Sequence, residues 1–350
     1  MTKTLAGVDR TAQELVRALA PLASGRGWSL VCAVPANAPD DAEIRGRLGL
    51  GDESPILRSV LRGYLFEQVA LSRAMPSAIL LSLCNMGPIL RRRQLVMLHD
   101  AQVFDVPRSY PLAFRQAYRF LQPRLARRAG AVVTVSEYSR TRLRANGVTT
   151  GVPVDVVHNG TDHFGRVEPD DAILNRFGVA RKGYAFALGH PASHKNLGVL
   201  LQAYSCADIT LPPLVLAGHA PAGLAAGDQS VIAVGRVSDR ELKALYQNAR
   251  MFLFPSLTEG FGFPALEAMA CGCPVIAADA GAIPEVSGAA AIMVDPGNVR
   301  AWRTAIMRLH ADDEERGRMI IAGIEQANEF TWDRAAKKLA DIIGRLHQAI

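Results

Sequence analysis

The sequence predicts an α/β protein with two Rossmann-like domains, whose parallel sheets face each other across a cleft. Three observations support this fold class. The 350 residues exceed what one compact core accommodates, so two domains are expected. Hydrophobic residues make up 49% and charged residues 21% of the chain, which is typical of globular proteins. Apolar runs of strand length alternate with segments of helical period, and this alternation occurs in both halves of the chain.

The first half predicts five buried strands and four helices. The strands are expected at residues 28–34, 78–83, 94–98, 131–135 and 154–158. The helices are expected at residues 9–22, 60–75, 112–128 and 137–146. A domain of this class usually opens with a strand, yet here the helical pattern begins at Asp9. Either residues 1–6 form a short first strand, or the first strand is missing from this chain.

The second half repeats the scheme. Strands are expected at residues 184–188, 214–217, 231–234, 251–254, 275–277 and 290–294. Helices are expected at residues 197–204, 239–249, 265–271 and 299–310. A loop-like segment at 159–165 separates the two series, and we predict an interdomain hinge there. The expected domains are therefore 1–163 and 164–330, followed by an amphipathic helix within 331–350.

The positive charge of the chain is concentrated in its first half. Residues 1–160 hold 21 Lys and Arg against 12 Asp and Glu, or +9, and residues 161–350 hold 18 against 21, or −3; the sum is the formal charge of +6. A basic half suggests an anionic partner, such as a lipid diphosphate, a membrane surface or nucleic acid; an ordinary arginine-rich solvated surface is the alternative. Nucleic acid is disfavoured because few aromatic residues interleave with the arginines and no recognition motif occurs.

The sequence predicts neither a membrane span nor a metal site. The richest apolar run, at 78–84, has seven residues, well short of the ~20 that a bilayer requires. Residues 1–10 are polar, so no signal segment is predicted. The five cysteines contain no Cys-x-x-Cys pair, and Cys271 and Cys273 have no clustered third ligand. We therefore expect a reduced, cytoplasmic protein with structural thiols.

A glycine-rich segment follows the strand expected at 251–254. It reads Pro255-Ser-Leu-Thr-Glu-Gly-Phe-Gly-Phe-Pro264 and opens the next helix. Taken alone, Gly260-x-Gly262-x-x-Ala265 matches a dinucleotide-binding loop, and Asp279, 19 residues after Gly260, occupies the ribose-binding position. A nicotinamide-dependent oxidoreductase is therefore one interpretation of this segment.

Two glutamates favour a nucleotide sugar over a nicotinamide. Glu259 stands directly before the first glycine, where it would repel a pyrophosphate held against the backbone. In the loop it faces whatever lies beyond the diphosphate, and a sugar supplies hydroxyl groups there. Pro264 fits the first turn of a helix whose free N–H groups attract a phosphate. Glu267, one turn into that helix, suits the hydroxyl pair of a ribose.

The segment 255–275 resembles the signature of retaining glycosyltransferase family 4, which has the GT-B architecture of two Rossmann domains. The resemblance covers nearly the whole chain through shorter motifs in the family's order: Leu98-His99-Asp100, Val135-Ser136-Glu-Tyr-Ser139, Val157-His-Asn-Gly160, Lys195-Asn196-Leu197, Pro284-Glu285-Val286 and Phe330-Thr-Trp332. It implies that 1–163 is the acceptor-side domain, that 164–330 is the nucleotide-sugar donor domain, and that the helix at 331–350 packs back toward the N-terminal domain. Gly7-Val-Asp-Arg10 resembles a bacterial exopolysaccharide branch, many members of which use GDP-mannose.

The resemblance implies roles for residues of the donor domain. Glu259 would contact the donor sugar, and Glu267 the ribose. The backbone amides of Gly260, Phe261, Gly262 and Phe263 would approach the sugar and phosphates. Lys195 follows the strand that ends at Gly189 and would neutralise the leaving diphosphate. Family members often carry an arginine after the equivalent of Gly189; this chain has His190, so Arg236 is expected to assist Lys195.

On the acceptor side, His99 would touch the sugar from the opposite domain, and Gly7 would let the first helix approach the diphosphate. The chain contains no Asp-x-Asp pair, which is consistent with transfer that needs no metal or other cofactor. We interpret Ser136 and Ser139 as helix-capping residues. His163, His219 and His347 receive no role.

We therefore expect a retaining hexosyltransferase that acts on a glycan or a lipid-linked glycan in polysaccharide biosynthesis. The donor is expected to be a GDP- or UDP-linked sugar, and GDP-mannose, as the source of mannose, is the single donor that we predict. Since no side chain stands out as a nucleophile, the departing phosphate oxygen would take the acceptor proton. The alternative is a non-catalytic sugar-nucleotide-binding partner with a degenerate acceptor half. The basic half also predicts peripheral association with the inner face of the membrane.

Overall fold

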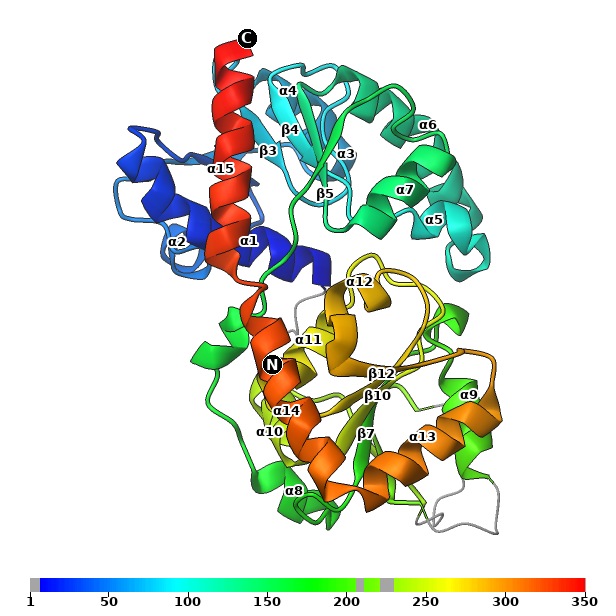
Figure 1. Cartoon of the computed structure of the whole chain (residues 1–350). Coiled ribbons are helices and arrows are strands. Elements are labelled where there is room, and N and C mark those ends of the chain that lie inside the picture. Colours follow the sequence, from blue (N-terminus) through cyan, green and yellow to red (C-terminus); the bar gives the residue numbers. More distant parts are fainter. Residues whose placement is uncertain (1–6, 206–210, 221–229, 350) are drawn as a thin grey trace. The chain divides into compact units, whose positions relative to one another are not determined.

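The computed structural model describes residues 7–205, 211–220 and 230–349 (Figure 1). These residues form two compact units. The C-terminal unit is Thr161–Phe330, and the N-terminal unit combines the described residues up to Gly160 with those from Thr331 onward. The boundaries predicted from the sequence are 163/164 and 330/331. Residues 1–6, on which the alternatives for a first strand depend, lie outside the described residues.

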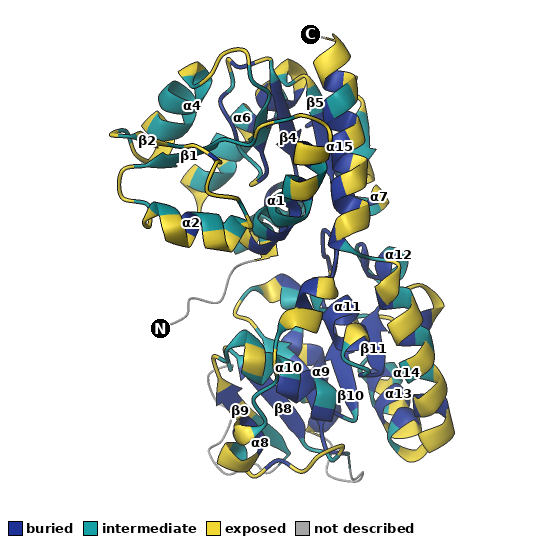
Figure 2. Cartoon of the chain, turned by 90° about the vertical axis from the view of Figure 1, so that its left-hand side faces the viewer, coloured by how far each residue is buried: buried dark blue, intermediate teal, exposed yellow. Residues whose placement is uncertain are grey.

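The C-terminal unit is built on a parallel sheet with the strand order β12-β11-β10-β7-β8-β9. The strands are β7 (Ala185–Gly189), β8 (Leu214–Gly218), β9 (Val231–Gly235), β10 (Met251–Phe254), β11 (Val275–Ala278) and β12 (Ala291–Val294). The helices are α8 (Ala172–Phe177), α9 (Leu197–Tyr204), α10 (Asp239–Asn248), α11 (Phe263–Ala270), α12 (Ile283–Ser287), α13 (Val299–Ala311) and α14 (Asp313–Asn328), with 3-10 turns η3 (Asp162–Arg166), η4 (Ser193–Lys195) and η5 (Gly288–Ala290). Figure 2 shows β10 and β11 as buried strands and the outer faces of α13 and α14 as exposed.

In the described part of the N-terminal unit, the strands form a parallel sheet of order β3-β4-β5-β6 and a separate parallel pair, β1-β2. The strands are β1 (Cys32–Pro35), β2 (Ile56–Ser59), β3 (Leu80–Ser82), β4 (Gln94–Met97), β5 (Ala131–Thr134) and β6 (Val154–Val156). The helices are α1 (Gly7–Gly25), α2 (Asp41–Leu48), α3 (Gly63–Leu65), the π-helical η1 (Phe66–Ala70), α4 (Leu71–Arg73), α5 (Gln102–Asp105), the 3-10 turn η2 (Pro107–Ser109), α6 (Leu112–Arg128), α7 (Glu137–Ala145) and α15 (Trp332–Ala349). The predicted α/β class with parallel sheets is confirmed.

The last helix, α15, returns to the N-terminal unit and packs against α1. Its apolar residues Leu339, Ile342 and Ile343 are buried, as their helical spacing predicts. Gly160 is required where the chain returns, because a Cβ atom there would overlap the backbone of Thr331 and Trp332.

Local sequence rules account for several boundaries. α10 begins with a capping box in which Ser238 Oγ accepts a hydrogen bond from the Glu241 amide and the Glu241 carboxylate accepts one from the Ser238 amide. Ser136 caps α7 by accepting a hydrogen bond from the Ser139 amide at 2.9 Å, which confirms the capping role expected for it.

Two expectations about elements are wrong. The strand expected at 28–34 begins at Cys32, because the Trp28 amide donates to Ala23 O and so belongs to the turn that ends α1. The single helix expected at 60–75 is divided into α3, η1 and α4. Six further elements, β2, α2, α5, α8, α12 and α14, were not predicted from the sequence. α14 contains Gly323, and a glycine inside a helix weakens the helical pattern of the sequence. The structure explains this glycine by close packing, because a Cβ atom at residue 323 would lie only 3.2 Å from Met269 Cγ of α11.

None of the helices in the described part of the chain is both long enough and apolar enough to cross a bilayer.

Candidate active site

The glycine-rich segment forms the turn from β10 into α11. Gly262 precedes the helix with φ of 107°, a conformation that glycine adopts without strain. Pro264 lies in the first helical turn, where its missing N–H costs no hydrogen bond. Residues 258–262 are all buried. The turn therefore places the amino end of α11 at the carboxyl edge of the sheet, where sheets of this kind bind ligands.

Glu259 lies in this turn and is paired with Lys195. Glu259 Oε1 accepts a hydrogen bond from Lys195 Nζ at 2.7 Å, and the Glu259 side chain is only 11% exposed. Lys195 ends η4, the 3-10 turn that follows β7. Because β7 and β10 are neighbouring parallel strands, their carboxyl ends meet at one edge of the sheet. The fold thus brings together a carboxylate and an ammonium group that are 64 residues apart in sequence.

Backbone and amide contacts join the turns after β7 and β10. The Leu257 amide donates to His194 O at 2.7 Å. Asn196 Nδ2 donates to Pro255 O at 3.1 Å and to Pro296 O at 2.8 Å, so this side chain also holds the turn that follows β12. The geometry around Lys195 is therefore set by bonds that do not involve its own side chain.

The turn after β11 fixes the backbone of Glu259. The Ala282 amide donates to Glu259 O at 3.1 Å. Gly281 has φ of 65°, and a Cβ atom on it would lie 2.5 Å from the Glu259 amide nitrogen. Gly281 is thus required both for its backbone conformation and for the close approach of two chain segments. Gly281 was not among the residues predicted from the sequence.

Gly189 ends β7 at a point where the next strand comes very close. Its carbonyl oxygen accepts a hydrogen bond from the His219 amide at 2.9 Å, and a Cβ atom on Gly189 would overlap the His219 carbonyl oxygen. The following residue, His190, accepts a hydrogen bond from the Ala192 amide through Nδ1. Burial and the nearby Lys195 lower the pKa of His190 from its ordinary value. His190 therefore does not supply the positive charge that an arginine would supply at this position.

Glu267 is buried in α11 beside a histidine from a distant segment. Its Oε1 lies 3.5 Å from Nε2 of His163, which belongs to η3 and is only 3% exposed. The His163 ring also meets the Phe263 ring edge-on, with centroids 6.4 Å apart. No role was predicted for His163, because the sequence around a histidine in a loop does not indicate which distant side chain it contacts.

Arg236 belongs to a different turn from Lys195. It follows the carboxyl end of β9, two strands away from β7 in the sheet order, and its side chain is exposed. Its expected assistance to Lys195 stays a prediction.

The N-terminal unit contains the two remaining predicted residues, His99 and Gly7. His99 follows the carboxyl end of β4, and its Nε2 lies 2.8 Å from Leu83 O. Since a carbonyl oxygen only accepts, Nε2 carries the proton, and Nδ1 of the neutral ring has a free lone pair. Burial lowers the pKa of His99 to about 4, so the ring is neutral near pH 7. Gly7 is exposed at the first position of α1.

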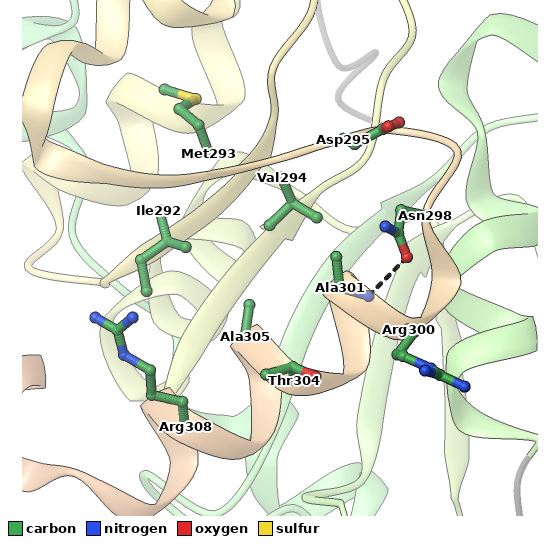
Figure 3. Close-up of a pocket in the computed structure, with 10 residues that line it drawn as sticks. All are labelled: Ile292, Met293, Val294, Asp295, Asn298, Arg300, Ala301, Thr304, Ala305 and Arg308. Atoms are coloured by element: carbon green, nitrogen blue, oxygen red, sulfur yellow. Dashed lines mark hydrogen bonds between the residues drawn. The ribbon is translucent and has the colours of Figure 1, made fainter.

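A groove of about 400 Å³ lies elsewhere in the C-terminal unit, between edge strand β12 and helix α13 (Figure 3). Ile292, Ala305 and Arg308 are among its lining residues, and none of the predicted site residues is. Asn298 at its end caps α13 by accepting a hydrogen bond from the Ala301 amide at 3.0 Å. The groove is therefore separate from the turns that carry Lys195, Glu259 and Glu267.

Comparison with known proteins identifies the family. Residues 183–312 match the family model described as glycosyl transferases group 1. Over 261 residues, the chain is 30% identical to O-antigen chain mannosyltransferase B of Escherichia coli, covering 69% of this chain and 67% of that protein. The chain belongs to the group 1 glycosyl transferases. The expectation of a glycosyltransferase enzyme, drawn from the segment that begins at Pro255, is confirmed at the level of the family.

Solved structures of glycosyltransferases share the fold over the full length. Sucrose-phosphate synthase from Thermosynechococcus elongatus superposes with a TM-score of 0.73 at 20% identity, covering 99% of this chain and 94% of that one. Anabaena HepE in complex with UDP and glucose gives a TM-score of 0.72 at 16% identity, covering 98% and 97% of the two chains. The GT-B fold expected for this glycosyltransferase is thereby confirmed.

Within the glycosyltransferase, the structure groups Gly189, Lys195, Glu259, the turn 260–263 and Glu267 in the C-terminal unit. Glu259 and Lys195 are in direct contact, and Glu267 lies about one turn into α11. His99 and Gly7 belong to the N-terminal unit. The roles implied for these residues stay predictions.

Proposed function

We propose that this glycosyltransferase moves a hexose from a nucleotide diphosphate to an acceptor hydroxyl, with retention of configuration and without a metal ion. The observation that carries the proposal is the Lys195–Glu259 pair at the amino end of α11, with Glu267 further along the same helix. A cation, a helix terminus and two carboxylates match the diphosphate, the sugar and the ribose of such a donor.

The Lys195–Glu259 ion pair suggests a way in which the donor would bind. A diphosphate at the amino end of α11 would compete with Glu259 for Lys195, because it carries more negative charge than one carboxylate. Lys195 would then stabilise the leaving diphosphate. Glu259, released from Lys195 and buried in its turn, would accept hydrogen bonds from sugar hydroxyls. The same two residues thus bind each other before the donor arrives and bind different parts of it afterwards.

Retention follows if acceptor and leaving group share one face of the sugar. In this proposal the departing phosphate oxygen takes the acceptor proton, and no side chain forms a covalent intermediate. The role that the family resemblance implies for His99, contact with the sugar, is compatible with its neutral ring, in which Nδ1 can accept a hydrogen bond from a hydroxyl. Positioning and electrostatic stabilisation then supply the rate enhancement.

We take GDP-mannose as the donor and a glycan or lipid-linked glycan in polysaccharide biosynthesis as the acceptor. Support comes from the relative named O-antigen chain mannosyltransferase B, which shares 30% identity. A UDP-linked hexose is the rival donor, since HepE, which has the same fold, was solved with UDP and glucose. A thermal-shift screen with GDP, UDP, ADP and their sugars discriminates between them, because a ligand that binds the folded state raises its Tm.

A second candidate is a non-catalytic sugar-nucleotide-binding partner. It is favoured by the division of the described N-terminal strands into a four-stranded sheet and a separate β1-β2 pair. Purified chain that binds a nucleotide sugar but neither hydrolyses it nor transfers the sugar to extracted glycan acceptors would support this candidate. Transfer to any such acceptor would exclude it.

A further inference from the structure

One end of the N-terminal unit carries large apolar side chains and arginines side by side. Leu90, in the loop between β3 and β4, is 73% exposed, and Phe120 of α6 is 54% exposed. Leu90 and Ile89 line a groove of about 350 Å³ together with Arg124, Arg127 and Arg128. The Arg124 guanidinium lies 3.5 Å from the centre of the Phe120 ring, so Phe120 joins the same surface. We call these six residues the basic–apolar patch.

The patch arises from the periodicity of α6, which lies at the periphery of its unit (Figure 1). Phe120, Arg124, Arg127 and Arg128 are spaced at i, i+4, i+7 and i+8, so they project from one helical face. All four are exposed. The opposite face of α6 contributes Leu125 and Ala126 to the core. The arginines are therefore not needed for packing the unit.

No carboxylate from the neighbouring sequence neutralises this charge. The chain has no Asp or Glu between Glu67 and Asp100, or between Asp105 and Glu137. These two stretches supply the loop before β4, all of α6 and the start of β5. Arg92 adds a further exposed cation. It lies close to the end of α6, because its carbonyl oxygen accepts a hydrogen bond from the amide of Gly130, just after that helix.

The patch is remote from the predicted acceptor-side residue within the unit. It lies at the amino ends of β4 and β5, between residues 89–93 and the last turn of α6. His99 follows the opposite, carboxyl end of β4. Changes in the patch should therefore leave His99 undisturbed.

We propose that the basic–apolar patch is a docking surface for an anionic lipid bilayer. The arginines match lipid phosphates in charge, and Leu90 and Phe120 are positioned to enter the interfacial region beside them. Nucleic acid is a poorer match, because bases stack on aromatic rings and Phe120 is the one aromatic residue among the six residues of the patch. The patch would hold the enzyme at the inner face of the membrane, independently of which donor it uses.

The test is sedimentation of the purified full chain with vesicles of phosphatidylglycerol and phosphatidylcholine, compared with pure phosphatidylcholine, at low and high salt. The patch variant is Arg124→Gln/Arg127→Gln/Arg128→Gln. Its control is Arg300→Gln/Arg334→Gln/Lys338→Gln, which removes three exposed cations elsewhere and gives the same net charge of +3 (6 − 3). A second variant, Leu90→Ser/Phe120→Ser, tests the apolar part without changing the charge. Thermal unfolding with and without GDP checks that folding and nucleotide binding persist.

We expect salt-sensitive binding of the wild-type chain to the anionic vesicles only. Each arginine near an anionic surface contributes roughly five-fold in affinity, so the patch variant should lose about 100-fold. The control variant should lose much less, and the apolar variant should bind more weakly than the wild type. Absence of wild-type binding at low salt, equal losses in both triple variants, or tighter binding to mixed-sequence duplex DNA than to the vesicles would each overturn the proposal.

Discussion

Gly281 offers a sharp test of how Glu259 is positioned. A Cβ atom at residue 281 would lie 2.5 Å from the Glu259 amide nitrogen, and ordinary contact requires ~3.5 Å. In Gly281→Ala, the two segments must therefore separate by about 1 Å. The positive φ of 65° adds roughly 1 kcal/mol of backbone strain, and relief of the overlap adds about 1–3 kcal/mol. The free energy of unfolding should fall by the sum of these two costs, and the Tm should fall with it.

The displacement should also weaken recognition of the donor sugar. A hydrogen bond to a charged group contributes about 1.5–3 kcal/mol, so losing the Glu259 contact should weaken nucleotide-sugar binding by about 10- to 100-fold. Binding of the free nucleoside diphosphate should change little, because the three atoms nearest to a Cβ at residue 281 belong to Glu259 and Thr258. Calorimetry with GDP-mannose and with GDP, and with the UDP pair, measures both affinities.

Gly178→Ala is the matched control. Gly178 has φ of 63°, almost the same as Gly281, but a Cβ atom there meets nothing within 4 Å. This control should show the backbone strain of roughly 1 kcal/mol and unaltered ligand binding. If Gly281→Ala weakens nucleotide-sugar binding no more than Gly178→Ala does, the turn after β11 does not position Glu259.

Three further predictions concern the side chains of the site. Glu259→Gln and Lys195→Ala should each reduce kcat roughly 100-fold or more while preserving the fold, and near-normal turnover in both would contradict the proposed roles. His163→Gln should weaken binding of nucleotides with an intact ribose while leaving the sugar preference unchanged; an altered sugar preference would place His163 elsewhere in the mechanism. Burial lowers the pKa of His99 to about 4 from its ordinary value near 6.5, so below pH 6.5 the unfolded chain binds a proton that the folded chain does not. Stability should fall by up to about 3 kcal/mol as the pH drops from 6.5 to 4, and His99→Gln should flatten that part of a denaturation profile.

Local sequence patterns predicted the elements with strong periodicity and clear boundaries. β10, α6 and α9 begin and end at the predicted residues. Features that depend on tertiary contacts were not predicted from local patterns. Trp28 is typical of a strand, but its amide bonds to the end of α1. Gly323 is typical of a helix break, but it allows α14 to pack closely on α11. Such contacts join residues distant in sequence, and no local pattern reports them.

The same distinction applies to the site. Glu259 and Lys195 were predicted as separate residues, and the structure adds that they are hydrogen-bonded to each other. The contact of His163 with Glu267 and the close packing of Gly281 on Glu259 were missed, because each depends on how turns from different strands meet. Glycines after strand ends, such as Gly281 in the turn following β11, are the signal that could have indicated such close packing.

The central claim, that this glycosyltransferase binds a nucleotide sugar through Lys195 and two glutamates, is tested most directly by comparing Glu259→Gln with Glu267→Gln in calorimetry. We predict that Glu259→Gln weakens binding of the nucleotide sugar but not of the nucleoside diphosphate, that Glu267→Gln weakens both, and that NAD does not bind the wild-type chain. Equal effects of the two substitutions on both ligands, or tight binding of NAD, would contradict the claim.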